Sequence, residues 1–461
     1  MSADARSTDA LLRLSWTQPE DLAAHALVAA RLDGLDVGDL ERELSAAGGS
    51  LDAPVSGATP ERASERIRAV AARVTEAATA LPRPAQLLER EPDTWAAMAL
   101  EPAAVPVADG LDDRLRGAWL GRAIGCLVGK PVEKIPREGI RAIAESTGRW
   151  PVRGYFTEAG LDPDVAARWP WNRRSRPTSL DGVIDGMPED DDLNFAILAL
   201  VAQERAADAG GSLETRAVAQ LWLDQLPAGR VFTAERIAYR NLLAGDEPDV
   251  AAERGNPFVD WIGALIRADA YGWANPGDPG AAAELAVADA RLTHRRAGVH
   301  GAAFMAGAAA VAIAGVGVDA AIDAGLACVP SGSRLADAVR LGRSLAVSDL
   351  DDDACLDALH EAYGHLHWVH VLGNAALLAL AALRGRDDFA RGVGLAVAGG
   401  WDTDSVGASV GGLLGAAGTA AVPADLAAPI HGVYRTTLAG FDGVRFDDLA
   451  ARTLALAEAR A

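Results

Sequence analysis

Apolar residues recur along most of this chain at the three- and four-residue spacing of helices, and no sustained alternation of apolar and polar positions appears. Ala and Leu dominate the composition, and both favour helix. The pattern therefore predicts an all-α fold with many helices. In the middle and C-terminal parts the expected helices cover residues 213–225, 233–243, 260–270, 281–292, 301–314, 333–346, 354–364, 366–383, 389–398 and 447–459.

The first hundred or so residues form a separate pattern of helices. Thr17-Gln18-Pro19-Glu20 matches a capping box, a second helix is expected over residues 40–47, and a third opens at Thr59-Pro60-Glu61 and runs to about residue 80. A Pro-rich stretch over residues 81–106 follows. We therefore divide the chain into an N-terminal helical extension, residues 1–108, and a main domain, residues 109–461.

Two uncharged stretches, residues 301–318 and 405–422, approach the length of a membrane span. Both are built from Ala and Gly rather than Leu and Ile, so we expect buried core helices. Another helix is expected from Arg114 to Gly129, and it carries glycines at every fourth position from Gly117 onward. That spacing puts the glycines on one face, which predicts close approach of another helix or a ligand.

Charge and cysteine content narrow the function classes. The chain of 461 residues has a net charge of −21, which disfavours nucleic acid and anionic membranes as partners. Its three cysteines are far apart, so no disulfide framework or clustered zinc site follows. Residues 1–9 are polar and lack the apolar core of a signal peptide. We expect a cytoplasmic protein, and its oligomeric state stays open.

Two acidic turns, about two hundred residues apart, each precede an apolar helix: Glu189-Asp190-Asp191-Asp192 and Asp402-Thr403-Asp404-Ser405. Acids are favourable at a helix N-terminus, but four in a row repel one another, and ionised groups in an apolar region are costly unless paired or bound to metal. Mg²⁺ and Mn²⁺ prefer oxygen ligands. Joined in space, the turns predict a site for two Mg²⁺ ions about 4 Å apart, with Mn²⁺ as the alternative ion.

Two other chemistries fit the residues less well. His360 and His365 nearly match a zinc-protease helix, but their spacing of five does not put them on one face. A substrate or supporting role is expected instead for His370, which lies beside Asn374. Terpenoid synthases also use acid-rich helices with magnesium, but they need an aromatic-lined cavity, and aromatic residues make up only 5% of this chain.

Three motifs, in order, resemble those of the ADP-ribosylglycohydrolase family, an all-helical fold with two metals. Gly117–Glu133 is similar to its Gly-rich helix ending in Gly-x-Pro-x-Glu. Residues 189–192 stand where the family has Thr-Asp-Asp-Thr, and Gly400–Gly407 resembles Gly-Asp-Thr-Asp-Thr-x-Gly. Segments at 256–257, 262–269, 293–294 and 374–376 also fit. The resemblance covers about two-thirds of the chain, without its first hundred or so residues, and makes residues 109–461 the catalytic domain.

The resemblance implies roles for particular residues. Glu133 or Asp191 would be the general base. The implied metal ligands are Glu189, Asp190, Asp191, Asp402, Asp404 and Ser405. The expected substrate-binding residues, taken from the matching segments and the region of His370, are Gly129, Asn194, Asn256, Gly263, His294, His370, Asn374 and Trp401.

The function that the resemblance implies is magnesium-dependent hydrolysis of the glycosidic bond in an ADP-ribosylated protein or a small ribosyl conjugate. The alternative is a non-catalytic module that binds ADP-ribose or a nucleotide in the same pocket. The chain also departs from the family pattern. Glu189 and Asp192 replace Thr, Cys126 stands where many members have Asp, Trp401 is inserted before Asp402, and Ser405 replaces Thr.

Overall fold

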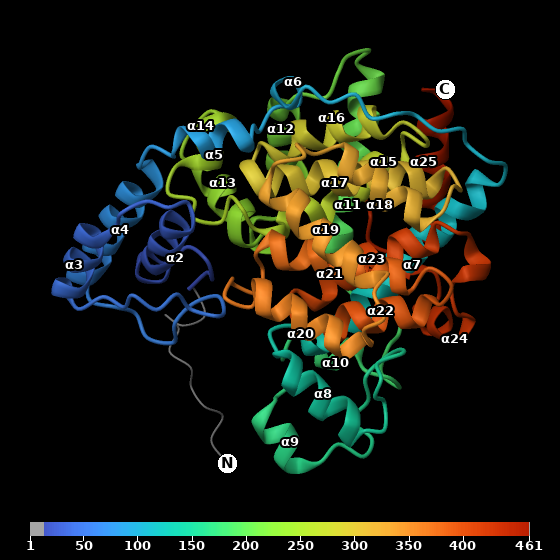
Figure 1. The fold of residues 1–461 in the computed structure, drawn as a ribbon, viewed down its shortest axis with the longest axis horizontal. Coiled ribbons are helices and arrows are strands. Elements are labelled where there is room, and N and C mark those ends of the chain that lie inside the picture. Colours follow the sequence, from blue (N-terminus) through green and yellow to red (C-terminus); the bar gives the residue numbers. More distant parts are fainter. Residues whose placement is uncertain (1–12, 461) are drawn as a thin grey trace.

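The computed structural model describes residues 13–460, and the expectation drawn from residues 1–9 lies outside that range. Within it the fold is all-α, as predicted, apart from one antiparallel pair of two-residue strands, β1 (Val433–Tyr434) and β2 (Val444–Arg445). Helices stack around a large apolar core that continues through the main domain (Figure 1).

The N-terminal extension has a small core of its own. Helices α2 (Pro19–Leu32), α3 (Gly38–Ala47) and α4 (Glu65–Ala80) enclose a cluster of apolar side chains separate from the main core. They form a lobe at one side of the main domain (Figure 1). The chain then runs across the main domain through α5 (Ala85–Arg90) and α6 (Trp95–Met98). The division at residue 108 stays a prediction, since this second stretch packs on the main domain.

A tightly packed helix pair positions the acidic turns. Helix α7 (Leu111–Gly129) lies antiparallel against α23 (Thr403–Gly415), because Gly117 meets Gly415 while Gly129 meets Thr403. A Cβ atom on Gly121 or Gly125 would overlap a backbone carbonyl oxygen of α23. The four-residue glycine spacing therefore allows backbone contact between the helices, and it brings the end of α7 beside the start of α23.

The remaining helices surround this pair. Their bounds are η1 (Lys130–Val132), α8 (Arg137–Ser146), α9 (Pro163–Arg168), α10 (Arg176–Ser179), α11 (Asp191–Asp208), α12 (Thr215–Gln225), η2 (Ala228–Arg230), α13 (Thr233–Leu243), α14 (Pro248–Glu253), η3 (Ile262–Arg267), α15 (Asp269–Trp273), α16 (Pro279–Ala290), α17 (Arg296–Ile313), α18 (Val318–Ala327), α19 (Arg334–Ala346), α20 (Asp352–Tyr363), α21 (Val371–Arg384), α22 (Phe389–Ala398), η4 (Thr419–Ala421), α24 (Ala424–Ala427), η5 (Ala428–Ile430) and α25 (Phe446–Glu458).

Helix α17 is long and apolar enough to cross a membrane by length and composition, and every one of its residues is buried inside the fold. This agrees with the prediction of a core helix over residues 301–314, although the helix begins five residues earlier, at Arg296.

Two expected helices are wrong in part, for one shared reason. Residues 260–261 and 366–370 are not helical, because the two segments pair with each other. Ile262 N donates to Val369 O at 3.0 Å, and Val371 N donates to Asp260 O at 3.1 Å. Contacts distant in sequence thus override local helix propensity at both places.

Candidate metal and substrate site

Three helix ends converge on one pocket of about 670 Å³. They are the turn after η1, which carries Glu133, and the starts of α11 and α23, which carry the two acidic turns. All of the residues implied as catalytic or metal-binding line this pocket: Glu133, Glu189, Asp190, Asp191, Asp402, Asp404 and Ser405. The two turns, far apart in sequence, therefore form one acidic cluster.

Asp190 lies beside a lysine side chain of the protein. Its side chain caps α11 by accepting from Asp192 N at 2.9 Å, and it pairs with the Lys130 ammonium. Although burial alone raises the pKa of Asp190, the ammonium holds that pKa below its usual value. Asp190 is therefore charged, and Lys130 is held against it.

Asp191, Asp402 and Asp404 have no such partner among the described residues. Burial raises the pKa of Asp191 well above its usual value, and the neighbouring Asp190 and Asp404 raise it further. Burial and Asp404 do the same for Asp402. Burial, with Glu133 and Asp190, raises the pKa of Asp404 to about 7. Three oxygen-rich side chains thus crowd together at a cost that bound cations would remove.

The carboxylate of Glu189, by contrast, is held by protein donors. Its Oε1 accepts from Thr437 N at 2.9 Å and from Asn194 Nδ2 at 3.3 Å, and its Oε2 pairs with Arg230 at 2.9 Å. The role of Glu189 as a metal ligand stays a prediction, and its engaged oxygens make it the weakest candidate of the six.

Glu133 lies on the same pocket wall and is held in place. Asn172 Nδ2 donates to its Oε2 at 2.6 Å, and Lys134 Nζ lies 3.3 Å from its Oε1. Arg173, Arg174 and Arg230 also line the pocket. Positive side chains therefore border the acidic cluster, although the chain as a whole is strongly negative.

Of the eight expected substrate-binding residues, Asn194 and Gly263 line the pocket. Asn194 has a structural task there as well, since its Oδ1 accepts from Tyr434 Oη at 2.7 Å and from Thr436 Oγ1 at 2.5 Å. Gly263 packs so closely on Glu235 that a Cβ atom would overlap that carboxylate.

The other six lie outside the pocket lining and perform structural roles. Asn374 Oδ1 accepts from the backbone amide of Asp402 at 3.1 Å, so this residue positions the cluster without facing the pocket. His370 caps α21, and Gly129 allows the contact with Thr403. Asn256 braces a turn by donating to Ala252 O and Thr293 O. His294 is fully buried and contacts Thr293. Trp401 stacks on His360.

A further group lies behind the pocket. One ligand atom from each of Cys126, Asp190 and Asp192 lies within 4.8 Å of the others, and all three residues are buried. Oδ1 of Asp192 lies 3.6 Å from the Arg122 guanidinium, and Oδ2 of Asp192 lies 3.7 Å from Cys126 Sγ. Asp192, one of the two extra acids in the first turn, therefore faces the interior rather than the pocket.

Several residues that line or support the pocket were not predicted. Lys130 stands inside the Gly-x-Pro-x-Glu motif and could have been found there. Tyr434 is positioned by the short strand β1, for which the sequence gives no signal. Its hydroxyl contacts the backbone N and O of Asp190 at 3.1 and 2.8 Å. Residues of the N-terminal extension line the pocket as well, which no motif indicates: Ser15, Trp16, Ser56, Gly57 and Ala58.

The comparison with protein families decides the assignment. The family model described as ADP-ribosylglycohydrolase matches residues 107–460, about three quarters of the chain. The chain belongs to the ADP-ribosylglycohydrolase family. Family membership supports a glycohydrolase enzyme and fits the all-α fold. The match leaves out the extension that lines part of the pocket.

The other comparisons add little to this assignment. A similar solved structure, an "ADP-ribosylglycohydrolase-related protein complex", shares 23% sequence identity and covers 77% of this chain and 100% of that chain, with a TM-score of 0.46. No curated protein sequence matches.

ADP-ribosylglycohydrolases are generally metal-dependent, and the residues of the acidic cluster fit a metal site. Among the described residues no Lys or Arg forms an ion pair with Asp191 or Asp402, and neighbouring carboxylates raise the pKa of each, so both offer oxygen ligands to a hard cation.

Proposed function

We propose that this protein is a metal-dependent hydrolase that cleaves the glycosidic bond at the ribose of an ADP-ribosylated substrate. The observation that carries the proposal is the convergence of Asp191, Asp402 and Asp404 in one pocket, where no Lys or Arg side chain within residues 13–460 forms an ion pair with them. Such a cluster is costly as a structural feature and useful as a ligand set for hard divalent cations.

Asp190, Asp191, Asp402, Asp404 and Ser405 would hold two Mg²⁺ ions, or Mn²⁺ in their place. When bound, such ions lower the pKa of water and orient ribose hydroxyls. The hydroxyl of Ser405 keeps the oxygen that a Thr would supply at this position. Because Lys130 already pairs with Asp190, binding of an ion at that carboxylate requires the ammonium to share or leave it.

The side chains around the cluster would bind and orient the substrate. Glu133 is fixed by Asn172 and reaches the pocket, so it can accept a proton from an attacking water, a task for which Asp191 is the other candidate. Lys134 and Arg230 give the pocket positive charge against the substrate's diphosphate, which the net charge of −21 would otherwise repel. We place the enzyme in the cytoplasm, acting on an ADP-ribosylated protein or a small ribosyl conjugate.

The test uses purified protein stripped of metal with a chelator. Release of ADP-ribose from arginine-, serine- and acetyl-linked conjugates is measured with and without added Mg²⁺ or Mn²⁺. We expect release from at least one linkage, dependent on the ion, and its loss in Asp404→Asn. The matched control is Asp387→Asn, which changes an exposed carboxylate that pairs weakly with Arg386 at 3.5 Å.

Two results would contradict the proposal. Undiminished release in the chelator would show that no metal is needed. Tight binding of ADP-ribose without release from any linkage would favour the non-catalytic module.

A further inference from the structure

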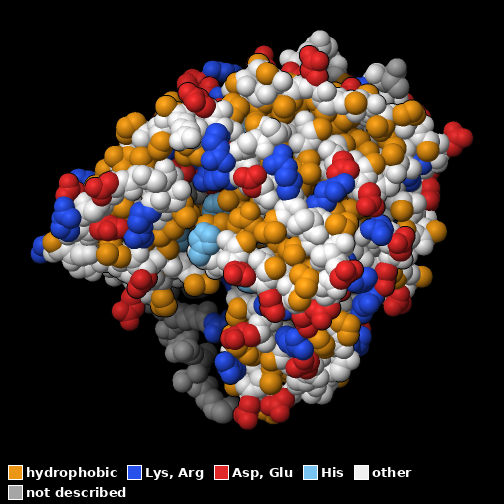
Figure 2. Space-filling view, in the orientation of Figure 1, with side chains coloured by type: hydrophobic (Ala, Val, Ile, Leu, Met, Phe, Trp, Pro, Cys, Tyr) orange, Lys and Arg blue, Asp and Glu red, His pale blue; other side chains and the backbone are white. Residues whose placement is uncertain are grey.

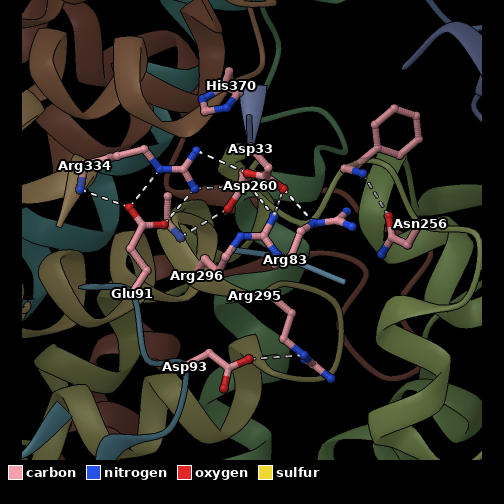
Figure 3. Close-up of polar contacts among 12 residues, drawn as sticks. Asp33, Arg83, Glu91, Asp93, Asn256, Asp260, Arg295, Arg296, Arg334 and His370 are labelled. Atoms are coloured by element: carbon pink, nitrogen blue, oxygen red, sulfur yellow. Dashed lines mark hydrogen bonds and ion pairs between the residues drawn. The ribbon is translucent and has the colours of Figure 1, made fainter. Parts of the chain in front are cut away.

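The N-terminal extension is anchored to the main domain by buried ion pairs (Figure 3). Asp33, at the end of α2, accepts from Arg83 Nε at 2.8 Å and from Arg296 at 3.2 Å. Arg296 also donates to Asp260 at 2.7 Å, so charges from both parts share one network. Only 6% of Asp33 is exposed. Since removing one member of such a network leaves the others unpaired and buried, the arrangement fixes the extension in one position.

An aromatic cluster provides a second anchor nearer the pocket. Trp16 of the extension packs edge-on against Phe258 and Trp261 of the main domain, with ring centroids 5.7 and 5.6 Å away. His25 lies 5.4 Å from His367, which is itself stacked on Trp261. Histidine side chains are visible at the surface where the extension meets the main domain (Figure 2). The two parts thus share an apolar contact as well as charges.

From these anchors the extension forms part of the pocket wall. Its pocket-lining residues lie in two short segments, Ser15-Trp16 and Ser56-Gly57-Ala58, and none is charged. Trp16 N donates to Gly57 O at 2.9 Å, which joins the segments. Arg236 of the main domain donates to Ser15 O at 2.7 Å and holds the first segment in place. The wall is therefore neutral, whereas the rest of the lining is strongly charged.

The extension also orients an indole ring that faces the pocket. Trp368 lines the pocket and is half-buried, and its Nε1 donates to Val55 O of the extension at 2.6 Å. The polar atom of the ring is therefore occupied by the extension. Lys134 Nζ lies 5.9 Å from the ring centroid. A flat apolar surface is thus placed beside a cation at the edge of the neutral wall.

The backbone around this wall is strained. Trp16, Lys134 and Thr233 line the pocket with φ angles of 63°, 74° and 42°, values that residues other than glycine rarely adopt. Such conformations persist only where surrounding contacts enforce them, and they gather at binding sites.

We propose that the N-terminal extension completes the substrate pocket, and that its neutral wall, with Trp368, binds the nucleobase of the ADP-ribosyl group. This inference rests on the proposed function. A nucleobase is planar and uncharged, and stacking on an aromatic side chain stabilises its binding. The neutral wall suits that group, whereas Lys134 and Arg230 suit the diphosphate next to it. An anionic or aliphatic group would gain less from an indole face.

The experiment compares a ligand that carries the base with one that lacks the whole adenosine monophosphate half and keeps one ribose and one phosphate. Binding of ADP-ribose and of ribose 5-phosphate, which has no base, is measured by calorimetry on full-length protein with Mg²⁺ present. Trp368→Ala removes the stacking surface from the main domain, and Ser56→Trp fills the pocket from the extension. Leu51→Trp is the control, because it adds the same side chain at a partly exposed site of the extension outside the pocket lining.

We expect both variants to weaken ADP-ribose binding about tenfold or more while ribose 5-phosphate binding stays unchanged. Leu51→Trp should match the unmodified protein. Unchanged ADP-ribose binding in both variants would overturn the inference. Equal weakening of both ligands would also overturn it, because the wall would then support the acidic cluster. Failure of the unmodified protein to bind or hydrolyse any ADP-ribosyl compound would instead overturn the proposed function itself.

Discussion

The side chain of Asn374 joins the backbone of the acidic cluster, at Asp402, to the backbone of Trp368 at the pocket edge. Its Oδ1 accepts from the amide of Asp402 at 3.1 Å, and its Nδ2 donates to Trp368 O at 2.8 Å. Asn374 is fully buried and does not line the pocket. It therefore sets the position of two pocket residues from outside the pocket lining.

Replacing Asn374 by Ala should lower both activity and stability. Loss of the side chain leaves the Asp402 amide unpaired in the interior, which costs about 1–3 kcal/mol of unfolding free energy. The shift of Asp402 should also reduce kcat at least tenfold. Chemical denaturation and steady-state kinetics measure the two effects.

Asn241→Ala is the matched control for that variant. Asn241 is equally buried and holds two backbone carbonyl groups, of Ala251 and Arg254, outside the pocket. The Asn241→Ala variant should lose a similar amount of unfolding free energy and keep the kcat of the unmodified protein. If the two variants retain equal kcat values, Asn374 has no positioning role.

The contact between α7 and α23 should not tolerate a single added methyl group. In Gly125→Ala the new Cβ would overlap Gly407 O, so the helices must separate where they hold the acidic cluster. We expect a loss of about 1–3 kcal/mol or more in unfolding free energy, with reduced activity. Gly211→Ala, at an open surface position, should be neutral or slightly stabilising. Unfolding midpoints in urea that coincide for both variants would contradict this account.

Periodicity and motif spacing predicted much of the fold and the centre of the site. The helical fold follows from apolar spacing. The glycines that begin at Gly117 predict close approach of another helix or a ligand, and the structure places α23 there. Asp190, Asp191, Asp402 and Asp404 could be named because each lies at a helix start, and helix starts present their side chains at a fixed place.

Features that depend on pairing between distant segments could not be predicted. Asn172 reaches Glu133 from an irregular stretch, and Tyr434 reaches Asp190 from a two-residue strand, so neither position carries a local signal. The contribution of Trp16 was missed because the extension carries no motif, and its packing against Trp261 decides where it lies. Conversely, His294, which was expected to bind substrate, is enclosed in the core outside the pocket lining, so its role stays a prediction.

The contact between the extension and the main domain should weaken in mild acid. Burial lowers the pKa of His25 to about 3, with a further contribution from His367, and burial lowers the pKa of His367 to about 4. Both histidines are therefore neutral when folded, whereas in the unfolded chain each binds a proton near pH 6.5. The free energy of unfolding keeps the full contribution of these histidines above pH 6.5. It falls as the pH drops from 6.5 towards 4, by about 1 kcal/mol per histidine for each pH unit.

His25→Phe isolates this effect, because a Phe ring can pack among the same aromatic side chains and cannot titrate. The difference in unfolding free energy between pH 7.5 and pH 5.5 should be smaller in this variant than in the unmodified protein. His431→Gln, at an exposed position, should leave that difference unchanged. An undiminished pH dependence in His25→Phe would rule out this cause.

The most direct test of the central claim follows metal binding and bond cleavage in the same titration. Metal-stripped protein is titrated with Mn²⁺, and the bound ions per chain are counted while ADP-ribose release from a hydrolysable conjugate is recorded. The acidic cluster predicts two ions per chain, with release rising as they bind, and loss of both signals in Asp402→Asn. Release that is complete before any ion binds, or that persists in Asp402→Asn with unchanged metal affinity, would contradict it.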